Sequence, residues 1–172
     1  MGRSVIFMFT VNHTQPIATA ELKGGKGYES IHGKVDIYDT YEGSILIIEV
    51  YGIPKELEDK NGGFHGFHIH DGDSCTGNAK DPFANAGMHY NPTNQRHPYH
   101  AGDLPPLLSN KGTAWGAIYT TRFYPEDVIG KTVILHDKPD DFRTQPSGGS
   151  GEKIACGEIK ACEKDMLGPD FC

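Results

Sequence analysis

The sequence lacks the features that would direct it to nucleic acid or into a membrane. It has no run of lysine or arginine, and 16 basic residues against 23 acidic ones give a formal net charge of −7. An acidic chain of this kind disfavours a nucleic-acid partner. No stretch approaches the ~20 apolar residues that a membrane-spanning helix needs. We therefore expect neither nucleic acid nor a membrane as a partner.

The N-terminal region also lacks the pattern of a secretory signal. Its apolar run, residues 5–9, is too short for the hydrophobic part of a signal peptide, and no A-x-A-like cleavage site follows it. As numbered, the chain is expected in the cytoplasm. If a leader was removed before Met1, an extracytoplasmic compartment is expected instead.

Cysteine is scarce, with four residues in 172. Cys75 and Cys156 lie in the globular region, whereas Cys162 and Cys172 lie in a short C-terminal tail. Four cysteines allow three pairings into two disulfides, and disulfides are typical of oxidising compartments. For the two tail cysteines, a second disulfide and two free thiols are both left open.

Long amphipathic helical patterns are absent as well, so little helix is expected. Short strand-like segments recur instead, at residues 17–22, 28–38, 44–51, 64–70, 114–121, 132–136 and 153–159. With 22 glycines and 11 prolines, this pattern predicts a turn-rich sandwich or barrel made of strands. The length fits a single domain, and no internal repeat is present.

Two long segments interrupt the strand pattern. Residues 71–110 are polar and crowded with His, Asp, Asn, Gly and Pro, and residues 137–152 contain two prolines and a Ser-Gly-Gly-Ser-Gly run. Loops of this length are uncommon in a compact domain and are usually functional. A bound metal would order the first loop, because ligand bonds can replace a hydrophobic core.

Several histidines are spaced as metal ligands. His68 and His70 alternate on one predicted strand, so both imidazoles point to the same face. A second group offers three nitrogens and one carboxylate, which suits tetrahedral Zn²⁺; its members are His89, His97, His100 and Asp103. His136 adds a further ligand at the end of a strand. The alternative, that all of these are ordinary surface histidines, is disfavoured by their number in one acidic domain.

Five motifs resemble those of copper/zinc superoxide dismutases. They resemble, in chain order, the signature strand, the bridging-histidine motif, the zinc-loop motif, the last copper ligand with a supporting aspartate, and the closing disulfide motif. The matching segments are GFHGFHIH (63–70), AGMHYNP (86–92), HAGDL (100–104), LH with two following aspartates (135–141), and residues 151–157. The resemblance covers about residues 16–160, with loop features closer to the bacterial enzymes. Residues 1–15 and the tail after Lys160 fall outside it.

The resemblance implies the fold and the metal ligands. The fold would be an all-β, eight-stranded antiparallel Greek-key barrel with two long functional loops. Copper would be bound by His68, His70, His89 and His136. Zinc would be bound by His89, His97, His100 and Asp103. His89 would bridge both ions as an imidazolate, because two divalent cations favour the loss of its protons.

The resemblance also implies residues that support the ligands. Asp140 would accept hydrogen bonds from one ligand of each metal and fix their orientation. His65 would pack behind the site, bonded to backbone. A disulfide between Cys75 and Cys156 would tie the first long loop to the last strand.

At one position the chain departs from the family pattern. The family commonly has an arginine three residues before the second disulfide cysteine, and here that residue is Lys153. The resemblance implies a catalytic cation that attracts and orients superoxide. Lysine keeps the charge but loses the planar, two-pronged donor geometry. We therefore expect a working but slower enzyme that is more sensitive to ionic strength; an ordinary strand-end lysine is the alternative.

The implied activity is the dismutation of superoxide to oxygen and hydrogen peroxide. It would use copper redox cycling with a zinc-supported bridging histidine, His89. One alternative is a non-enzymatic, dismutase-like copper/zinc-binding domain. A copper-delivery protein is disfavoured, because such proteins typically bind Cu(I) through sulfur and no C-x-x-C is present. Family enzymes often dimerise, so a homodimer is a further expectation.

Overall fold

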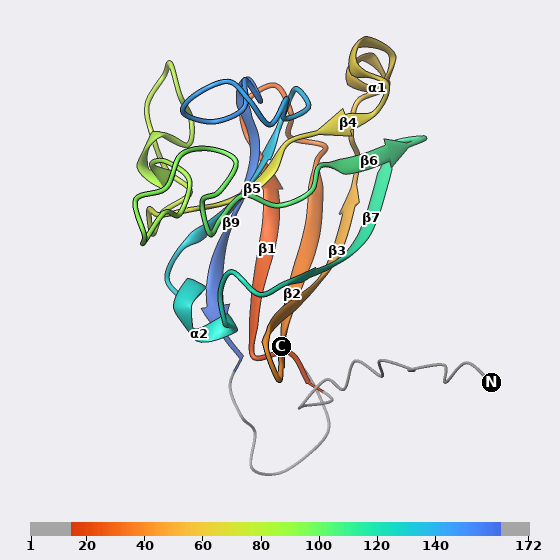
Figure 1. Cartoon of the computed structure of the whole chain (residues 1–172). Helices are drawn as coiled ribbons and strands as arrows, with labels where there is room; N and C mark the ends of the chain where they lie inside the picture. The colour runs from red at the N-terminus through yellow and green to blue at the C-terminus, as the bar shows by residue number, and fades with distance from the viewer. Residues whose placement is uncertain (1–14, 163–172) are drawn as a thin grey trace, which may run out of the picture.

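A computed structural model of the chain describes residues 15–162. Its strands form one antiparallel sheet in the order β4-β6-β7-β3-β2-β1-β9-β8-β5 (Figure 1). The strands are β1 (Ala18–Gly24), β2 (His32–Thr40), β3 (Gly43–Tyr51), β4 (Phe64–His65), β5 (Phe67–His70), β6 (Leu107–Asn110), β7 (Thr113–Thr120), β8 (Thr132–His136) and β9 (Lys153–Ala161). Helix is confined to α1 (Lys55–Asn61), α2 (Pro125–Val128) and the 3₁₀ turn η1 (Ala84–Ala86) within the described part.

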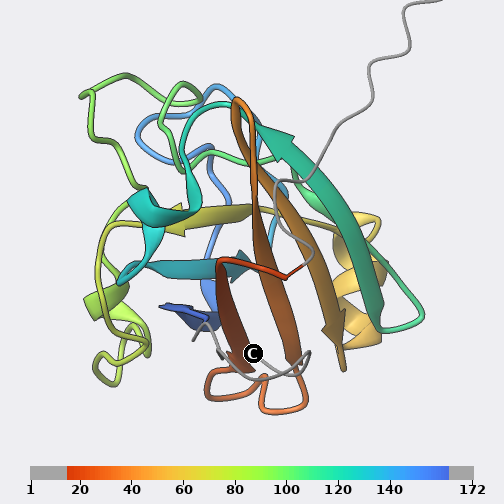
Figure 2. The same cartoon turned by 90° about the horizontal axis from the view of Figure 1, so that it is seen from below.

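The sheet curls into a nearly closed barrel. Strands β4 and β5 stand at opposite ends of the strand order, yet only Gly66 separates them in the chain. The two ends of the sheet must therefore meet at this residue. Gly66 N donates to Lys138 O at 2.8 Å, and His136 N donates to Gly66 O at 2.9 Å. Figure 2 shows the curvature from below, with β5 (yellow) and β8 (blue-green) running across the direction of β2 and β3.

The core fills the inside of the barrel. Along β2 and β3, buried and partly exposed residues alternate, as expected for strands with one face toward the core. Fully buried side chains include Leu46, Ile48, Phe67 and Ile69. A smaller apolar cluster, formed by Phe83, Ala86, Ile134 and the two cysteines Cys75 and Cys156, lies under the first long loop. Strand β8 contributes to both regions, with Val133 and Leu135 in the main core and Ile134 in the smaller cluster.

The all-β prediction is confirmed, with differences in detail. The structure has nine strands where the family resemblance implied eight. Compared with the seven segments predicted from the sequence, the predicted strand 64–70 divides at Gly66, and β6 lies inside the predicted loop 71–110. Strand β6 is only four residues long, so its alternation was too short to detect. Helix α1 was missed for the same reason: it spans seven residues and buries only Leu57. None of the described helices is long and apolar enough to span a membrane.

Candidate metal centre

The free edge of β5 positions the first long loop. Tyr90 N donates to Ile69 O at 2.8 Å, and Ile69 N donates to Gly102 O at 2.9 Å. Isolated bridges of the same kind pair His70 with His89 and His68 with Asp103. The loop therefore continues the sheet beside β5, and its candidate ligands lie next to those of the strand.

Four buried histidines form the first cluster of candidate ligands. One ring nitrogen from each lies within 4.8 Å of the others; the residues are His68, His70, His89 and His136. The ring centroids of His68 and His89 are 4.0 Å apart, and those of His68 and His136 are 5.0 Å apart. Strand β5, the first long loop and the end of β8 each contribute to this cluster.

The ring nitrogens of this cluster are only partly hydrogen-bonded. His68 Nε2 donates to Asp140 Oδ2 at 2.7 Å, and His70 Nδ1 donates to the Gly87 carbonyl at 3.0 Å. On the opposite side of each ring, His68 Nδ1 and His70 Nε2 have no hydrogen-bond partner among the described residues, and the same holds for His89 Nε2 and for His136. A buried polar atom without a partner is costly. Each of the four rings thus has a nitrogen without a partner among the described residues, and one ligand nitrogen from each ring lies within 4.8 Å of the others.

The second cluster gathers around a carboxylate. His89 Nδ1 lies 2.7 Å from Asp103 Oδ1, while His97 Nδ1 and His100 Nδ1 lie 3.1 and 3.2 Å from Asp103 Oδ2. All four residues are buried. Three imidazole nitrogens and one carboxylate oxygen make a donor set that suits tetrahedral Zn²⁺.

His89 belongs to both clusters. Its Nδ1 faces Asp103 in the second cluster, and its Nε2 is the unpartnered atom in the first. The two clusters are therefore joined by a single imidazole, with one ring nitrogen available to each.

Asp140 connects the two clusters from behind. Its Oδ2 accepts from His68 Nε2 at 2.7 Å, and its Oδ1 accepts from His97 Nε2 at 2.9 Å. Burial disfavours its charge, but the hydrogen bonds from His68 and from Phe142 N outweigh burial and lower the pKa of Asp140 to about 2. Asp140 is thus an anion that fixes one histidine of each cluster.

Burial favours the neutral form of three histidines of the first cluster. Burial lowers the pKa of His68 to about 4, against the opposing hydrogen bond to Asp140. Burial, together with the neighbouring histidines, also holds the pKa values of His70 and His136 well below the usual range. A metal ligand must be a deprotonated imidazole nitrogen, so these rings are in the protonation state that binds metal.

Gly148 leaves room for this arrangement. It has a φ of +67°, and a Cβ there would lie 1.9 Å from Asp140 Oδ1 and 2.7 Å from His97 Nε2. No side chain fits in that space.

The supporting residues lie where they can hold the loops. His65 is fully buried behind the first cluster, where its Nδ1 donates to the His136 carbonyl and its Nε2 lies 3.1 Å from Ser109 Oγ. Of the two remaining histidines, His32 is exposed on β2, and His13 lies outside the described residues.

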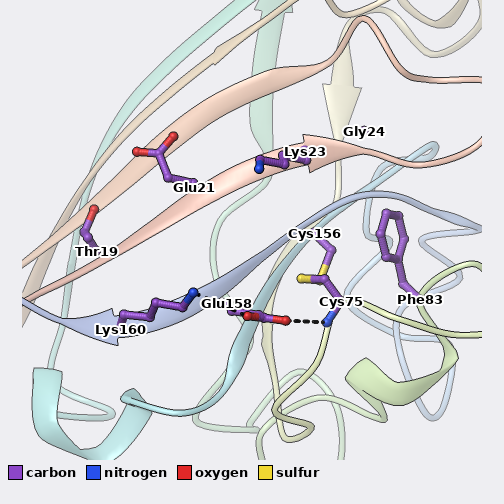
Figure 3. A pocket seen from close by; sticks show the side chains of 9 residues that line it. All are labelled: Thr19, Glu21, Lys23, Gly24, Cys75, Phe83, Cys156, Glu158 and Lys160. Carbon is purple, nitrogen blue, oxygen red and sulfur yellow. Dashed lines mark hydrogen bonds and ion pairs between the residues drawn. A yellow bond between two sulfur atoms is a disulfide. The ribbon is translucent and has the colours of Figure 1, made fainter.

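The disulfide between Cys75 and Cys156 is formed. It joins the first long loop to β9 at one end of a groove of about 390 Å³ (Figure 3). Glu158 Oε1 accepts from Cys75 N at 3.3 Å beside it. Closing a loop of this size stabilises a fold by roughly 3–5 kcal/mol in a chain-entropy estimate. No described cysteine is free, and this includes Cys162, for which a free thiol was one of the two alternatives. Cys172, the other tail cysteine, lies outside the described residues.

Lys153 lies opposite His136 in the pairing of β8 with β9. Its Nζ donates to Asp81 Oδ2 at 2.8 Å and to the Phe83 carbonyl at 3.1 Å. Its side chain is 15% exposed, against 41% for Asp81. The lysine is thus held by the first long loop, and part of its charge is neutralised there.

Comparison with known proteins agrees with this geometry. The family model for copper/zinc superoxide dismutase matches residues 31–159. The chain belongs to the copper/zinc superoxide dismutase family. The Cu-Zn superoxide dismutase of Pasteurella multocida is 36% identical over 155 residues, which cover 77% of this chain and 83% of that protein. Cu-Zn superoxide dismutase 2 of Aquifex aeolicus is 29% identical over 159 residues, covering 83% and 86% of the two chains.

A solved structure supports the same family. Cu/Zn superoxide dismutase from Brucella abortus superimposes with a TM-score of 0.70 at 26% identity, covering 83% of this chain and 99% of that one. The family implies copper and zinc, and the residues of this chain fit both ions. The first cluster offers unpartnered imidazole nitrogens alone, which suits a Cu(I)/Cu(II) couple. The second includes the carboxylate that suits zinc.

Three hydrogen-bonded contacts of the site were not predicted from the sequence. Asp81 binds Lys153, Gln145 binds the backbone of His97, and Arg122 binds the carbonyl of His100. Each joins residues at least 22 positions apart and involves a side chain that no motif includes. Only the register of the folded loops brings these partners together.

Replacing Gly148 with alanine tests how tightly the site is packed. We expect Gly148→Ala to displace Asp140 and His97, and so to lower the urea midpoint and the zinc content of the purified chain. Gly149→Ala is the matched control, because its φ is +62° but its Cβ would meet nothing closer than 3.6 Å. The control should lose only ~1–2 kcal/mol of stability, which is the cost of placing alanine in the left-handed backbone region. Equal losses in the two variants would show that the collision with Asp140 does not matter.

Proposed function

We propose that this chain catalyses the dismutation of superoxide, in which two superoxide ions and two protons give one molecule of oxygen and one of hydrogen peroxide. The observation that carries the proposal is the pair of buried clusters joined by His89. The names of its relatives, including those from Pasteurella multocida and Aquifex aeolicus, support the same reaction.

We assign the first cluster to copper and the second to zinc. The copper ligands are His68, His70, His89 and His136, and the zinc ligands are His89, His97, His100 and Asp103. Bound copper would supply the one-electron exchange with superoxide, while zinc, which has no redox chemistry, would hold the ligand geometry. Asp140 would keep His68 and His97 oriented through its two hydrogen bonds.

His89 is the residue that we assign to proton transfer. Its Nε2 lies among the nitrogens of the first cluster without a partner in the described part of the chain. This atom can bind either copper or a proton. It would therefore have to release copper to hold a proton between the two half-reactions, and it would then pass that proton to the second superoxide. Its Nδ1, beside Asp103, keeps the ring in place as the proton comes and goes.

Lys153 is the cation that we assign to attracting superoxide. Two observations support this: Lys153 pairs with His136 in the sheet, and its positive charge is one of the causes that lower the pKa of His136. The ion pair with Asp81 weakens this charge, and the net charge of −7 opposes the approach of an anion. Both effects support the expectation of a slower enzyme. We propose two causes for the lower rate: the replacement of arginine by lysine, and the ion pair of Lys153 with Asp81.

The proposed reaction is tested by loading the full chain with copper and zinc and measuring both metal content and superoxide consumption. We expect about one copper and one zinc per chain, and catalysis that disappears when copper is removed by a chelator. Both metals bound without superoxide consumption would favour the alternative of a non-enzymatic metal-binding domain. Copper bound and then passed to an acceptor protein would favour copper delivery.

The role of Lys153 is tested by charge removal. We expect Lys153→Ala to lower kcat/KM by about tenfold, the lower end of the range for electrostatic steering, and to reduce the fall of the rate with added salt. Lys80→Ala removes an exposed charge next to Asp81 and should leave kcat/KM almost unchanged. Asp81→Asn should raise kcat/KM at low salt, because it frees the lysine charge. An unchanged kcat/KM in Lys153→Ala, or a wild-type rate that rises with salt, would exclude this role.

Other features of the chain remain part of the proposal. We propose a single domain with a core of about residues 16–160, acting on superoxide without a nucleic-acid or membrane partner. A homodimer is the expected assembly, and its mass in solution can be measured by light scattering.

A further inference from the structure

We propose that Gln145 and Arg122 are positioning residues that hold the backbone of the zinc-binding loop in its ligand geometry. The inference rests on the assignment of zinc to the second cluster. It concerns residues 97–103, which carry three of the four zinc ligands.

This loop has no regular secondary structure between residues 97 and 102, where the chain forms neither helix nor strand. Its internal backbone hydrogen bonds include Asp103 N to the His100 carbonyl at 3.3 Å. A flexible loop would have to lose its conformational freedom each time it bound a metal ion, and this cost weakens binding. Contacts from outside the loop can reduce that cost.

Gln145 holds the backbone of His97 at two points. Its Nε2 donates to the His97 carbonyl at 2.7 Å, and its Oε1 accepts from His97 N at 3.1 Å. The amide side chain thus copies the paired hydrogen bonds of an antiparallel strand. Gln145 lies in the same loop as Asp140, which binds the His97 ring at Nε2. With backbone and ring both fixed, His97 Nδ1 is directed at the zinc position.

Arg122 binds three further backbone carbonyls of the loop. It follows β7, and its Nη1 lies 3.0 Å from the carbonyl oxygens of His100 and Asp103 and 3.1 Å from that of Pro98. Three carbonyl dipoles therefore converge on one cationic group, and hydrogen bonds from a charged donor are the stronger kind. The Arg122 backbone is itself fixed, because its N donates to Thr120 Oγ1 at the end of β7.

Both contacts act on the zinc ligands and on none of the residues that belong only to the copper set. Gln145 bonds to His97, and Arg122 bonds to Pro98, His100 and Asp103. Loss of either contact should therefore weaken zinc binding and leave the copper ligands in place. A general structural role would instead lower the stability of the whole domain.

The test measures zinc transfer from the full chain, loaded with copper and zinc, to a colorimetric chelator. We expect Gln145→Leu and Arg122→Gln each to lower zinc affinity by about tenfold, the lower end for residues that support metal ligands. The visible spectrum of Cu(II) should stay unchanged. Arg122→Lys keeps the charge and should recover part of the affinity, and it also tests the contact if Arg122→Gln is not recovered folded.

Two residues of the preceding stretch provide matched controls. Gln95→Leu removes a glutamine side chain that bonds only to Thr93 O at 3.2 Å among the described residues, and Arg96→Gln removes an exposed charge next to His97. Both should keep wild-type zinc affinity.

Zinc affinity within twofold of wild type in Gln145→Leu and in both Arg122 variants would overturn the proposal. Equal losses of copper and zinc, or the same loss in the controls, would also overturn it. The zinc assignment itself is checked with Asp103→Ala: if this variant keeps wild-type zinc affinity, the assignment fails and the inference fails with it.

Discussion

The imidazole of His89 is the group on which the arrangement of the site depends. One of its nitrogens lies 2.7 Å from Asp103, and the other lies unpartnered among three further buried histidines. Burying so many imidazoles in one place costs free energy unless their lone pairs are used. Metal ions on both sides of His89 would satisfy them. The shared ring would then make copper and zinc one centre and not two independent ones.

The barrel provides the fixed part of this centre, and the loops provide the rest. Strand β5 carries His68 and His70, and its free edge pairs with the backbone that carries His89 and Asp103. Asp140, in the second long loop, joins His68 to His97. The disulfide ties the first long loop, which carries His89 and Asp103, to β9. The first long loop also binds Lys153 through Asp81 and Phe83. The same loop therefore positions both the candidate zinc ligands and the Lys153 side chain.

Much of the fold and the ligand sets could be predicted from the sequence, because they follow from local patterns. Alternation predicted β2 and β3, and the motifs around His68, His89 and His136 proposed the clusters that the structure brings together. The division of a predicted strand at Gly66 and the short strand β6 could not be predicted, because they depend on barrel closure and pairing. The contacts of Gln145, Arg122 and Asp81 depend on loop register, which leaves no pattern in the sequence.

The most direct test of a shared imidazole is the metal content of single-ligand variants of the full chain. After loading with both metals and dialysis, His70→Ala should lose mainly copper, and His100→Ala should lose mainly zinc. His89→Ala should lose both, because its ring serves both clusters. If His89→Ala loses only one metal and binds the other as wild type does, the two sites are independent and the shared role of His89 is contradicted.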